Sequence, residues 1–216
     1  MAVKHKVLIV DDHPIVRHGL AELIARQPDL EMCGDAADVP EALRQVETRR
    51  PDVAVIDISL EGGNGIELIE QIRALYPEVK MLVSSMHDEK VFAGRALRAG
   101  ALGYINKRES IRKVIDAVRQ VLRGEIYLSP QMASRLLHRA AIGEPLDHDP
   151  AETLSNRELE VLEMIGHGMT TQQIARKLDL SPRTVETHRK KIKTKLNLAN
   201  SAQLSRAAFQ WVQEQG

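Results

Sequence analysis

Short apolar runs alternate with longer amphipathic stretches through the first 124 residues of the chain. Runs rich in Val, Ile and Leu are typical of strands buried on both faces of a parallel sheet, and apolar residues at helical spacing indicate helices that pack on one face. The pattern predicts strands over 7–10, 30–36, 53–57, 81–85 and 103–107, and helices over 14–24, 40–50, 66–75, 91–99 and 111–122. This alternation predicts an α/β domain with helices on both faces of a parallel sheet.

The first predicted helix begins at Pro14, because a proline in the first turn loses no hydrogen bond. Its apolar residues follow at helical spacing. We expect one buried face to include Ile15, Val16, Leu20, Leu23 and Ile24.

The pattern is helical throughout the C-terminal third of the chain. Capping boxes at Ser155 and Thr170 each predict a helix start, and Ser181 followed by Pro182 predicts a third. The second helix is short, a tight turn follows it, and the third helix runs to about Leu196. A short helix, a turn and a longer helix are typical of a helix-turn-helix motif. One more helix is predicted over 201–211.

The segment between the two patterns is predicted to be a linker. Residues 129–140 have a helical pattern, whereas 142–152 contain prolines, a glycine and several acids without periodicity. We therefore expect an α/β domain over 1–128, a linker with one helix over 129–152 and an all-helical domain over 153–216.

Charge is distributed unevenly, although the 216 residues carry no net charge. Residues 1–128 hold 18 basic and 20 acidic residues, and residues 153–216 hold 10 basic and 6 acidic ones. A basic C-terminal domain behind a slightly acidic one suggests different partners. The single cysteine, Cys33, excludes an intrachain disulfide and is expected to be a buried, inert thiol. No apolar run suits a membrane span or a signal peptide, so we expect a cytoplasmic protein without a membrane partner.

Charged and hydroxyl side chains stand where the predicted strands end. They are Asp11, Asp12, Asp57, Ser85 and Lys107. In a parallel sheet these ends meet at one edge, where ligands bind. Three carboxylates close together need a hard cation, and Mg²⁺ with oxygen ligands is the expected one. A carboxylate beside Mg²⁺ can attack phosphorus, with a lysine and a hydroxyl positioned to neutralise and hold the transferred group. One acid alone would more simply be a helix cap.

Together, Asp11-Asp12, Asp57, Ser85 and the Gly103-Tyr104-x-x-Lys107 motif resemble the receiver domain of two-component response regulators. The resemblance covers residues 5 to about 124. It implies a doubly wound, CheY-like (flavodoxin-like) sheet with strand order 2-1-3-4-5.

The resemblance also implies a role for each matching residue. Asp57 is the phosphoryl acceptor, and Mg²⁺ is held by Asp12, Asp57 and the backbone carbonyl of Ser59, with Asp11 assisting through water. Lys107 pairs with the phosphoryl group. Ser85 and Tyr104 are the switch residues. The sequence departs from the family at Glu61 and Arg108, where many receivers have proline.

The longer C-terminal helix is predominantly polar and cationic, and a charge run alone would more simply be a solvated surface. Here it follows a full helix-turn-helix pattern, and the segments from Leu154, Thr171 and Ser181 resemble the LuxR/FixJ/NarL-type DNA-binding domain. The resemblance implies that the recognition helix contacts bases and phosphates. The expected contacts are Arg183, Thr184, Glu186, Thr187, Lys190, Lys191 and Lys195. Glu186 stands where relatives often have lysine, and it would prefer a cytosine amino group to a phosphate. The last helix resembles a dimerisation helix.

The two halves predict a transcription regulator, not an enzyme. A sensor histidine kinase would phosphorylate Asp57, and phosphorylation would control dimerisation and binding to paired half-sites in promoter DNA. One alternative is a DNA-binding protein that is independent of phosphorylation and uses the receiver only to dimerise. A turnover enzyme of the aspartyl-phosphate type would need a second acid at the position of Ser59. A quorum-sensing regulator would need a ligand-binding front half.

Overall fold

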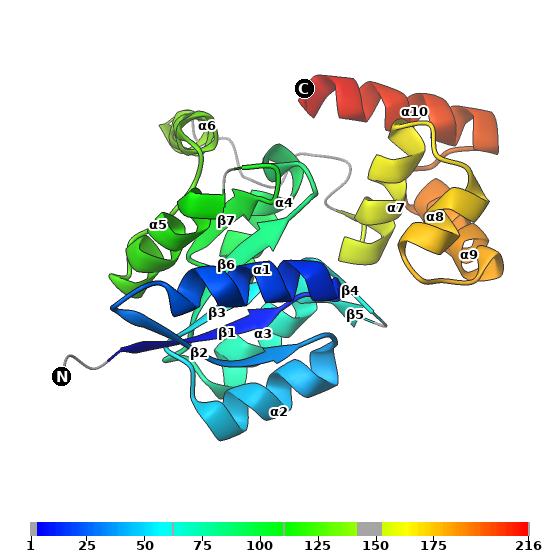
Figure 1. Ribbon diagram of the computed structural model, residues 1–216. Helices are drawn as coiled ribbons and strands as arrows, with labels where there is room; N and C mark the ends of the chain where they lie inside the picture. Colours follow the sequence, from blue (N-terminus) through cyan, green and yellow to red (C-terminus); the bar gives the residue numbers. More distant parts are fainter. Residues whose placement is uncertain (1–3, 62, 110, 142–152, 216) are drawn as a thin grey trace. The chain divides into compact units, whose positions relative to one another are not determined.

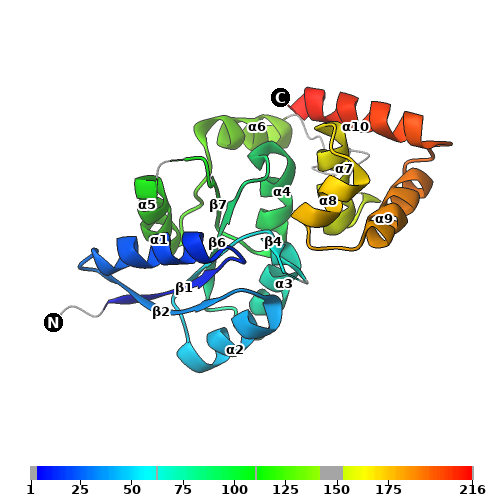
Figure 2. The same cartoon turned by 45° about the vertical axis from the view of Figure 1, so that its right-hand side comes forward.

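The computed structural model describes residues 4–61, 63–109, 111–141 and 153–215, and Figures 1 and 2 show the arrangement of its elements. The chain divides into two compact units, Met1–Leu136 and Leu137–Gly216. The part of the predicted linker over 142–152 lies outside the described residues.

A five-stranded parallel sheet forms the centre of the first unit. Its strands are β1 (His5–Val10), β2 (Leu30–Ala36), β3 (Val53–Ile56), β6 (Lys80–Ser85) and β7 (Gly103–Asn106). They lie in the order β2-β1-β3-β6-β7, which is order 2-1-3-4-5 when the strands of this sheet are numbered by themselves. The predicted fold is therefore confirmed.

Helices cover both faces of this sheet. They are α1 (Pro14–Ala25), α2 (Val39–Arg49), α3 (Gly65–Leu75), α4 (Glu89–Ala99) and α5 (Ile111–Leu122). Helices α1 and α5 share one core with alternate residues of the central strands, such as Val7 and Val55. Helices α2, α3 and α4 follow one another across the other face (Figure 2). Both faces of β1 and β3 are thus buried, as their unbroken apolar runs predict.

The buried face of α1 differs from the prediction at one residue. Leu20 and Ile24 are buried against the sheet, whereas Ile15 is 82% exposed. At about 100° per residue, Ile15 points about 140° away from Leu20 and about 180° away from Ile24. The prediction that Ile15 shares the buried face was wrong. Cys33, expected to be buried, is only partly buried, and its thiol lies 3.4 Å from the Val7 carbonyl.

The segment after β3 contains a small hairpin where the sequence predicted only a loop. Strands β4 (Ser59–Leu60) and β5 (Gly63–Asn64) pair in antiparallel fashion. Gly65 then approaches the chain at Asp57 so closely that a β-carbon would lie 1.9 Å from the Asp57 carbonyl oxygen. Gly65 N–H donates to the Ile58 carbonyl at 2.7 Å. This close packing fixes the backbone around Asp57.

The second unit is helical, and its helices begin where the capping residues predict. The elements from the end of the sheet domain onward are α6 (Pro130–Ala141), α7 (Asn156–Gly166), α8 (Thr171–Lys177), α9 (Pro182–Lys195) and α10 (Ser201–Gln215). Ser155 and Thr170 form the two predicted capping boxes, and the Ser181 hydroxyl accepts from Thr184 N–H. Helices α8 and α9 with their turn form the predicted helix-turn-helix. None of the helices in the described ranges is long and apolar enough to cross a membrane.

Candidate functional site

Three acids meet at the carboxyl edge of the sheet because β1 and β3 are paired in register. Val10 lies opposite Ile56, so the residues that follow them, Asp11 and Asp57, leave the sheet side by side. The backbone extends this pairing, with Asp57 N–H donating to the Val10 carbonyl at 2.8 Å. Both carboxylates are almost fully buried, at 2% exposure for Asp11 and 4% for Asp57. Asp12 completes the cluster at the rim.

Lys107 is the cation that faces these acids from the end of β7. Its Nζ lies 2.5 Å from Asp57 Oδ2 and 2.6 Å from Asp11 Oδ2. The backbone N–H of Lys107 donates to the backbone carbonyl of Ser85 at 2.8 Å, which joins the lysine to the end of β6. The sheet therefore brings Asp11 and Asp57 within hydrogen-bonding range of the Lys107 ammonium, and Ser85 is joined to the same lysine through the backbone.

The charges in this cluster shift the pKa values of its buried groups. Burial raises the pKa of Asp57 above its ordinary value, and the neighbouring Asp11 charge adds to the rise, whereas the Lys107 ammonium opposes it. For Lys107, burial lowers the pKa, but attraction to Asp57 and Asp11 outweighs burial and the pKa is raised. Lys107 is thus held as a cation, and the surplus negative charge resides on the acids.

The oxygen atoms of the cluster fit a hard divalent cation. Ligand atoms from Asp11, Asp12, His13 and Asp57 lie within 4.8 Å of one another. Asp57 Oδ1 is buried and makes no hydrogen bond within the described part of the chain. Asp12 Oδ1 makes none either, although His13 Nδ1 lies 2.5 Å away. Unpartnered carboxylate oxygens in excess over one lysine are the donor set that Mg²⁺ prefers.

Ser85 and Tyr104 lie on the paired strands β6 and β7, and His87 connects Tyr104 to Ser59. Ser85 is fully buried at the end of β6, and Tyr104 is fully buried in β7. The Tyr104 hydroxyl donates to the His87 carbonyl at 3.0 Å, and Asn106 Nδ2 donates to the same oxygen at 3.0 Å. The His87 imidazole Nε2 lies 2.9 Å from the Ser59 hydroxyl. His87 thus joins the segment after Asp57 to Tyr104.

His87 is not among the predicted site residues, although the structure gives it this linking role. The usable signal is its position two residues after Ser85, where the buried β6 strand has just ended. Its ring packs on Phe92 with centroids 4.7 Å apart. A histidine that is 8% exposed needs polar partners, and the structure supplies them from two segments.

The predicted DNA-contact residues of α9 form a mostly exposed surface, and the side chains of four of them, Thr184, Glu186, Thr187 and Lys195, have partners within the domain. Lys195 Nζ lies 2.7 Å from Oε2 of the nearly buried Glu158. The Thr187 hydroxyl donates to the Arg183 carbonyl of its own helix at 3.0 Å. Glu186 is paired with Thr171 of α8 and Arg189 of α9. The ion pair gives Lys195 a structural role in joining α9 to α7.

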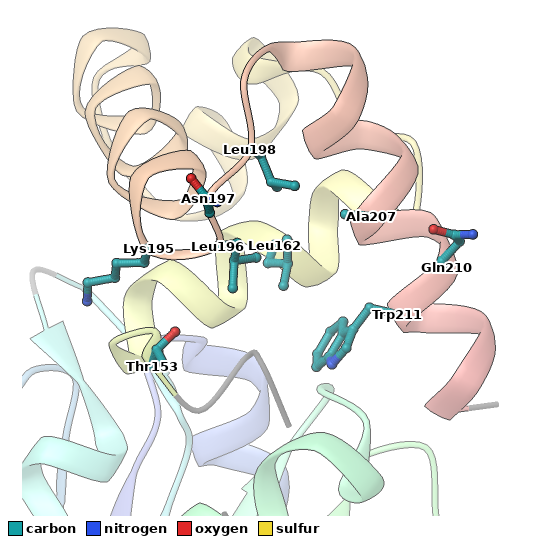
Figure 3. A pocket seen from close by; sticks show the side chains of 9 residues that line it. All are labelled: Thr153, Leu162, Lys195, Leu196, Asn197, Leu198, Ala207, Gln210 and Trp211. Carbon is teal, nitrogen blue, oxygen red and sulfur yellow. The ribbon is translucent and has the colours of Figure 1, made fainter. Parts of the chain in front are cut away.

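A cavity of about 440 Å³ lies among α7, α10 and the turn that follows α9 (Figure 3). Leu162, Leu198 and Trp211 are among its apolar lining residues, and Lys195 is the one predicted contact residue on its wall. Because the acids of the sheet edge take no part in its lining, the cavity is a feature of helix packing and not of the acidic site.

Comparison with known families divides the chain in the same way as its structure. Residues 7–119 match the response regulator receiver domain, and residues 152–208 match the luxR family of bacterial regulatory proteins. The acids of the sheet edge, Asp11, Asp12 and Asp57, fall within the first match together with Ser85, Tyr104 and Lys107, and α7, α8 and α9 fall within the second.

Individual relatives extend over nearly the whole chain. The oxygen regulatory protein NreC of Staphylococcus carnosus is 37% identical over 204 residues, covering 92% of this chain and 94% of its own. The response regulator GacA of Pseudomonas aeruginosa is 35% identical over 201 residues, covering 93% of each chain. Among solved structures, RcsB of Salmonella enterica serovar Typhimurium, bound to promoter rprA with the phosphomimetic BeF₃⁻, has a TM-score of 0.61 at 25% identity. That match covers 94% of this chain and 98% of RcsB.

Proposed function

This chain belongs to the two-component response regulators with a LuxR-type DNA-binding domain, and from that premise we propose that phosphorylation of Asp57 controls its binding to promoter DNA. The observation that carries the proposal is the cluster of Asp11, Asp12, Asp57 and Lys107. One oxygen of its central carboxylate has no hydrogen-bond partner among the described residues. A nucleophile needs such a free oxygen, and Asp57 Oδ1 supplies it.

In the proposed reaction, the carboxylate oxygen of Asp57 that does not bind Mg²⁺ attacks the phosphorus of a phosphohistidine on a sensor kinase. The bond between phosphorus and the histidine nitrogen breaks as the bond to the aspartate oxygen forms, and the electron pair returns to the imidazole. Asp12, Asp57 and the Ser59 carbonyl would hold Mg²⁺, with Asp11 assisting, and the ion when bound neutralises charge on the transferred group. Lys107 and Ser85 then contact the phosphoryl oxygens from the ends of β7 and β6.

Phosphorylation would act on the DNA-binding unit through the residues that touch the acceptor. Ser85 and Tyr104 belong to adjacent paired strands, and Tyr104 is bonded through the His87 carbonyl to the segment that contacts Ser59. We expect their rearrangement to favour a homodimer that binds paired half-sites. Coupling energies between such sites are typically about 1–3 kcal/mol, or roughly 5- to 150-fold in affinity.

We propose that three segments of the chain have separate roles in this coupling. Residues 1–128 would act as the receiver, 129–152 as a linker and 153–216 as the DNA-binding domain. Within α9, Glu186, Thr187 and Lys190 would contact bases, Thr184, Lys191 and Lys195 would contact phosphates, and Arg183 would be a further DNA contact. Lys195, held by Glu158, would lie at the end of that surface. Loss of a phosphate contact should lower the salt dependence of binding.

The test is selection of binding sites from a random double-stranded DNA library, with and without Mg²⁺ plus acetyl phosphate. The native chain should bind its selected sites about tenfold more tightly with the phosphodonor. Asp57→Asn should bind equally in both conditions. Asp116→Asn, which alters an exposed acid of α5, should respond like the native chain.

Two results would contradict the proposal in different ways. A full response of Asp57→Asn to acetyl phosphate would show that another residue is the acceptor. Equal binding of the native chain in both conditions would favour a phosphorylation-independent regulator whose receiver serves as a dimerisation module.

A further inference from the structure

Glu186 is an acid in the middle of a cationic recognition helix, and the structure holds it in one place. Thr171, the first residue of α8, donates its hydroxyl to Glu186 Oε1 at 2.6 Å. Arg189 Nε, one turn further along α9, lies 3.5 Å from the same oxygen. Two side chains from two helices therefore fix a single carboxylate oxygen on the surface of the helix-turn-helix.

The other carboxylate oxygen remains available. Glu186 Oε2 makes no hydrogen bond or ion pair with any residue that the structure describes, and the Glu186 side chain is 59% exposed. The arrangement thus presents one acceptor atom outward while the opposite oxygen is anchored. Anchoring removes rotamer freedom before any ligand binds, which lowers the entropic cost of using that acceptor.

The Thr171 hydroxyl is available to bind Glu186 because the preceding residue, Thr170, caps α8. Thr170 accepts from Gln173 N–H at 3.3 Å, and Gln173 Oε1 accepts from Thr170 N–H at 2.8 Å. The capping box fixes the start of α8, so the Thr171 side chain is carried on a rigid backbone. In contrast, the hydroxyls of Thr187 and Thr194 bond to carbonyls of their own helix.

An oriented carboxylate discriminates among nucleic acid groups. Phosphates repel it, and among base edges of the major groove its preferred partner is the N4 amino group of cytosine. A carboxamide whose oxygen stays anchored would instead present an N–H donor, and the amino group of cytosine cannot accept a hydrogen bond from it.

We propose that Thr171 is a positioning residue for base recognition, which fixes Glu186 so that the carboxylate accepts a hydrogen bond from a cytosine in each half-site. This inference rests on the proposed DNA-binding function and deepens it by specifying one base pair. It makes the selectivity of α9 depend on a side chain from α8.

The experiment is the same random-site selection, followed by affinity measurements on the selected site and on sites with one pair changed. The native chain should require a C·G pair at one position per half-site, with about tenfold weaker binding when that pair is changed. Glu186→Gln, whose outward group becomes an N–H donor when its oxygen stays with Thr171, should lose the preference for cytosine at that position. No other position should change.

The role of Thr171 is tested by an isosteric series. Thr171→Val removes the hydroxyl and should reduce discrimination for cytosine by about three- to tenfold. Thr171→Ser should restore it. Thr194→Val, which removes a hydroxyl bonded only to its own helix, is the matched control and should select the native sequence. Fluorescence of Trp211, the only tryptophan of the chain, verifies that each variant keeps the folded helical unit.

Three unexpected results would each overturn a different claim. If Glu186→Gln selects the native sequence, Glu186 does not contact a base and the inference is overturned, while the proposed function stands. If Thr171→Val discriminates as well as the native chain, the positioning role is overturned. If the native chain selects no site in any condition, the proposed function fails and this inference fails with it.

Discussion

Replacing Lys107 by methionine should expose how much the acidic cluster depends on one cation. The variant keeps the length of the side chain and removes its charge, which leaves Asp11 and Asp57 buried without a counterion. At 2.5 and 2.6 Å and an effective dielectric constant of about 20, each lysine–carboxylate attraction is about 6 kcal/mol. Desolvation of the three groups offsets most of that attraction.

The net cost of removing one partner of a buried ion pair is typically about 3–5 kcal/mol. Protonation of Asp57 should limit this loss of stability. Burial already raises the pKa of Asp57, so its carboxylate can take up a proton once Lys107 is absent. We therefore expect the lower end, about 3 kcal/mol at pH 7, or a fall in the melting temperature of the first unit of about 10 °C. The deficit should shrink as the pH is lowered and Asp57 becomes protonated.

Calorimetry of the full chain in EDTA measures this change, while Trp211 fluorescence follows the helical unit separately. Saturating Mg²⁺, at about 100 times its dissociation constant, should return about 2.7 kcal/mol to the variant. Asp57→Asn in the Lys107→Met background should also recover stability by removing one of the crowded charges. Lys113→Met, which breaks an exposed pair with Glu109, should leave the melting temperature unchanged. If Lys107→Met melts like the native chain in EDTA, the ion-pair account of this cluster is wrong.

Three further changes test other parts of the structure. Tyr104→Phe removes the hydrogen bond to the His87 carbonyl and should cost about 1 kcal/mol by calorimetry, less if Asn106 alone suffices. Ser155→Ala removes the N-cap of α7 and should destabilise the helical unit by about 1 kcal/mol in urea titrations followed by Trp211 fluorescence. Burial, with the Arg157 charge, lowers the pKa of His188 below its ordinary 6.5, so the unfolded chain takes up a proton that the folded unit resists. The helical unit should therefore lose stability as the pH falls below about 6.5, and a flat profile would contradict this assignment.

Convergence of the acidic site could be predicted from sequence because each strand has a local pattern, and a parallel sheet brings the carboxyl ends of all its strands to one edge. Once β1 and β3 are buried parallel strands, Asp11 and Asp57 must meet at one edge. Side-chain pairs between distant segments could not be predicted in this way. Thr171 meets Glu186 across 15 residues, and Ser59 meets His87 across 28. Such contacts depend on rotamers and on the exact packing of two elements, and neither follows from hydrophobic periodicity.

The acidic cluster and the recognition helix each leave one carboxylate oxygen without a partner, although the first carboxylate lies among other acids and the second lies among cations. At the sheet edge, three carboxylates face one lysine, so one carboxylate oxygen of Asp57 remains unpartnered and the cluster has negative charge to spare. On α9, one carboxylate stands among several cations, and Thr171 and Arg189 bind one of its oxygens while the other is left open. In both places, one oxygen of a carboxylate has partners within the protein and the other oxygen is an oriented acceptor. An acceptor that is anchored but incomplete is suited to binding a specific partner, because the partner's arrival completes the charge or hydrogen-bond balance without rebuilding the site.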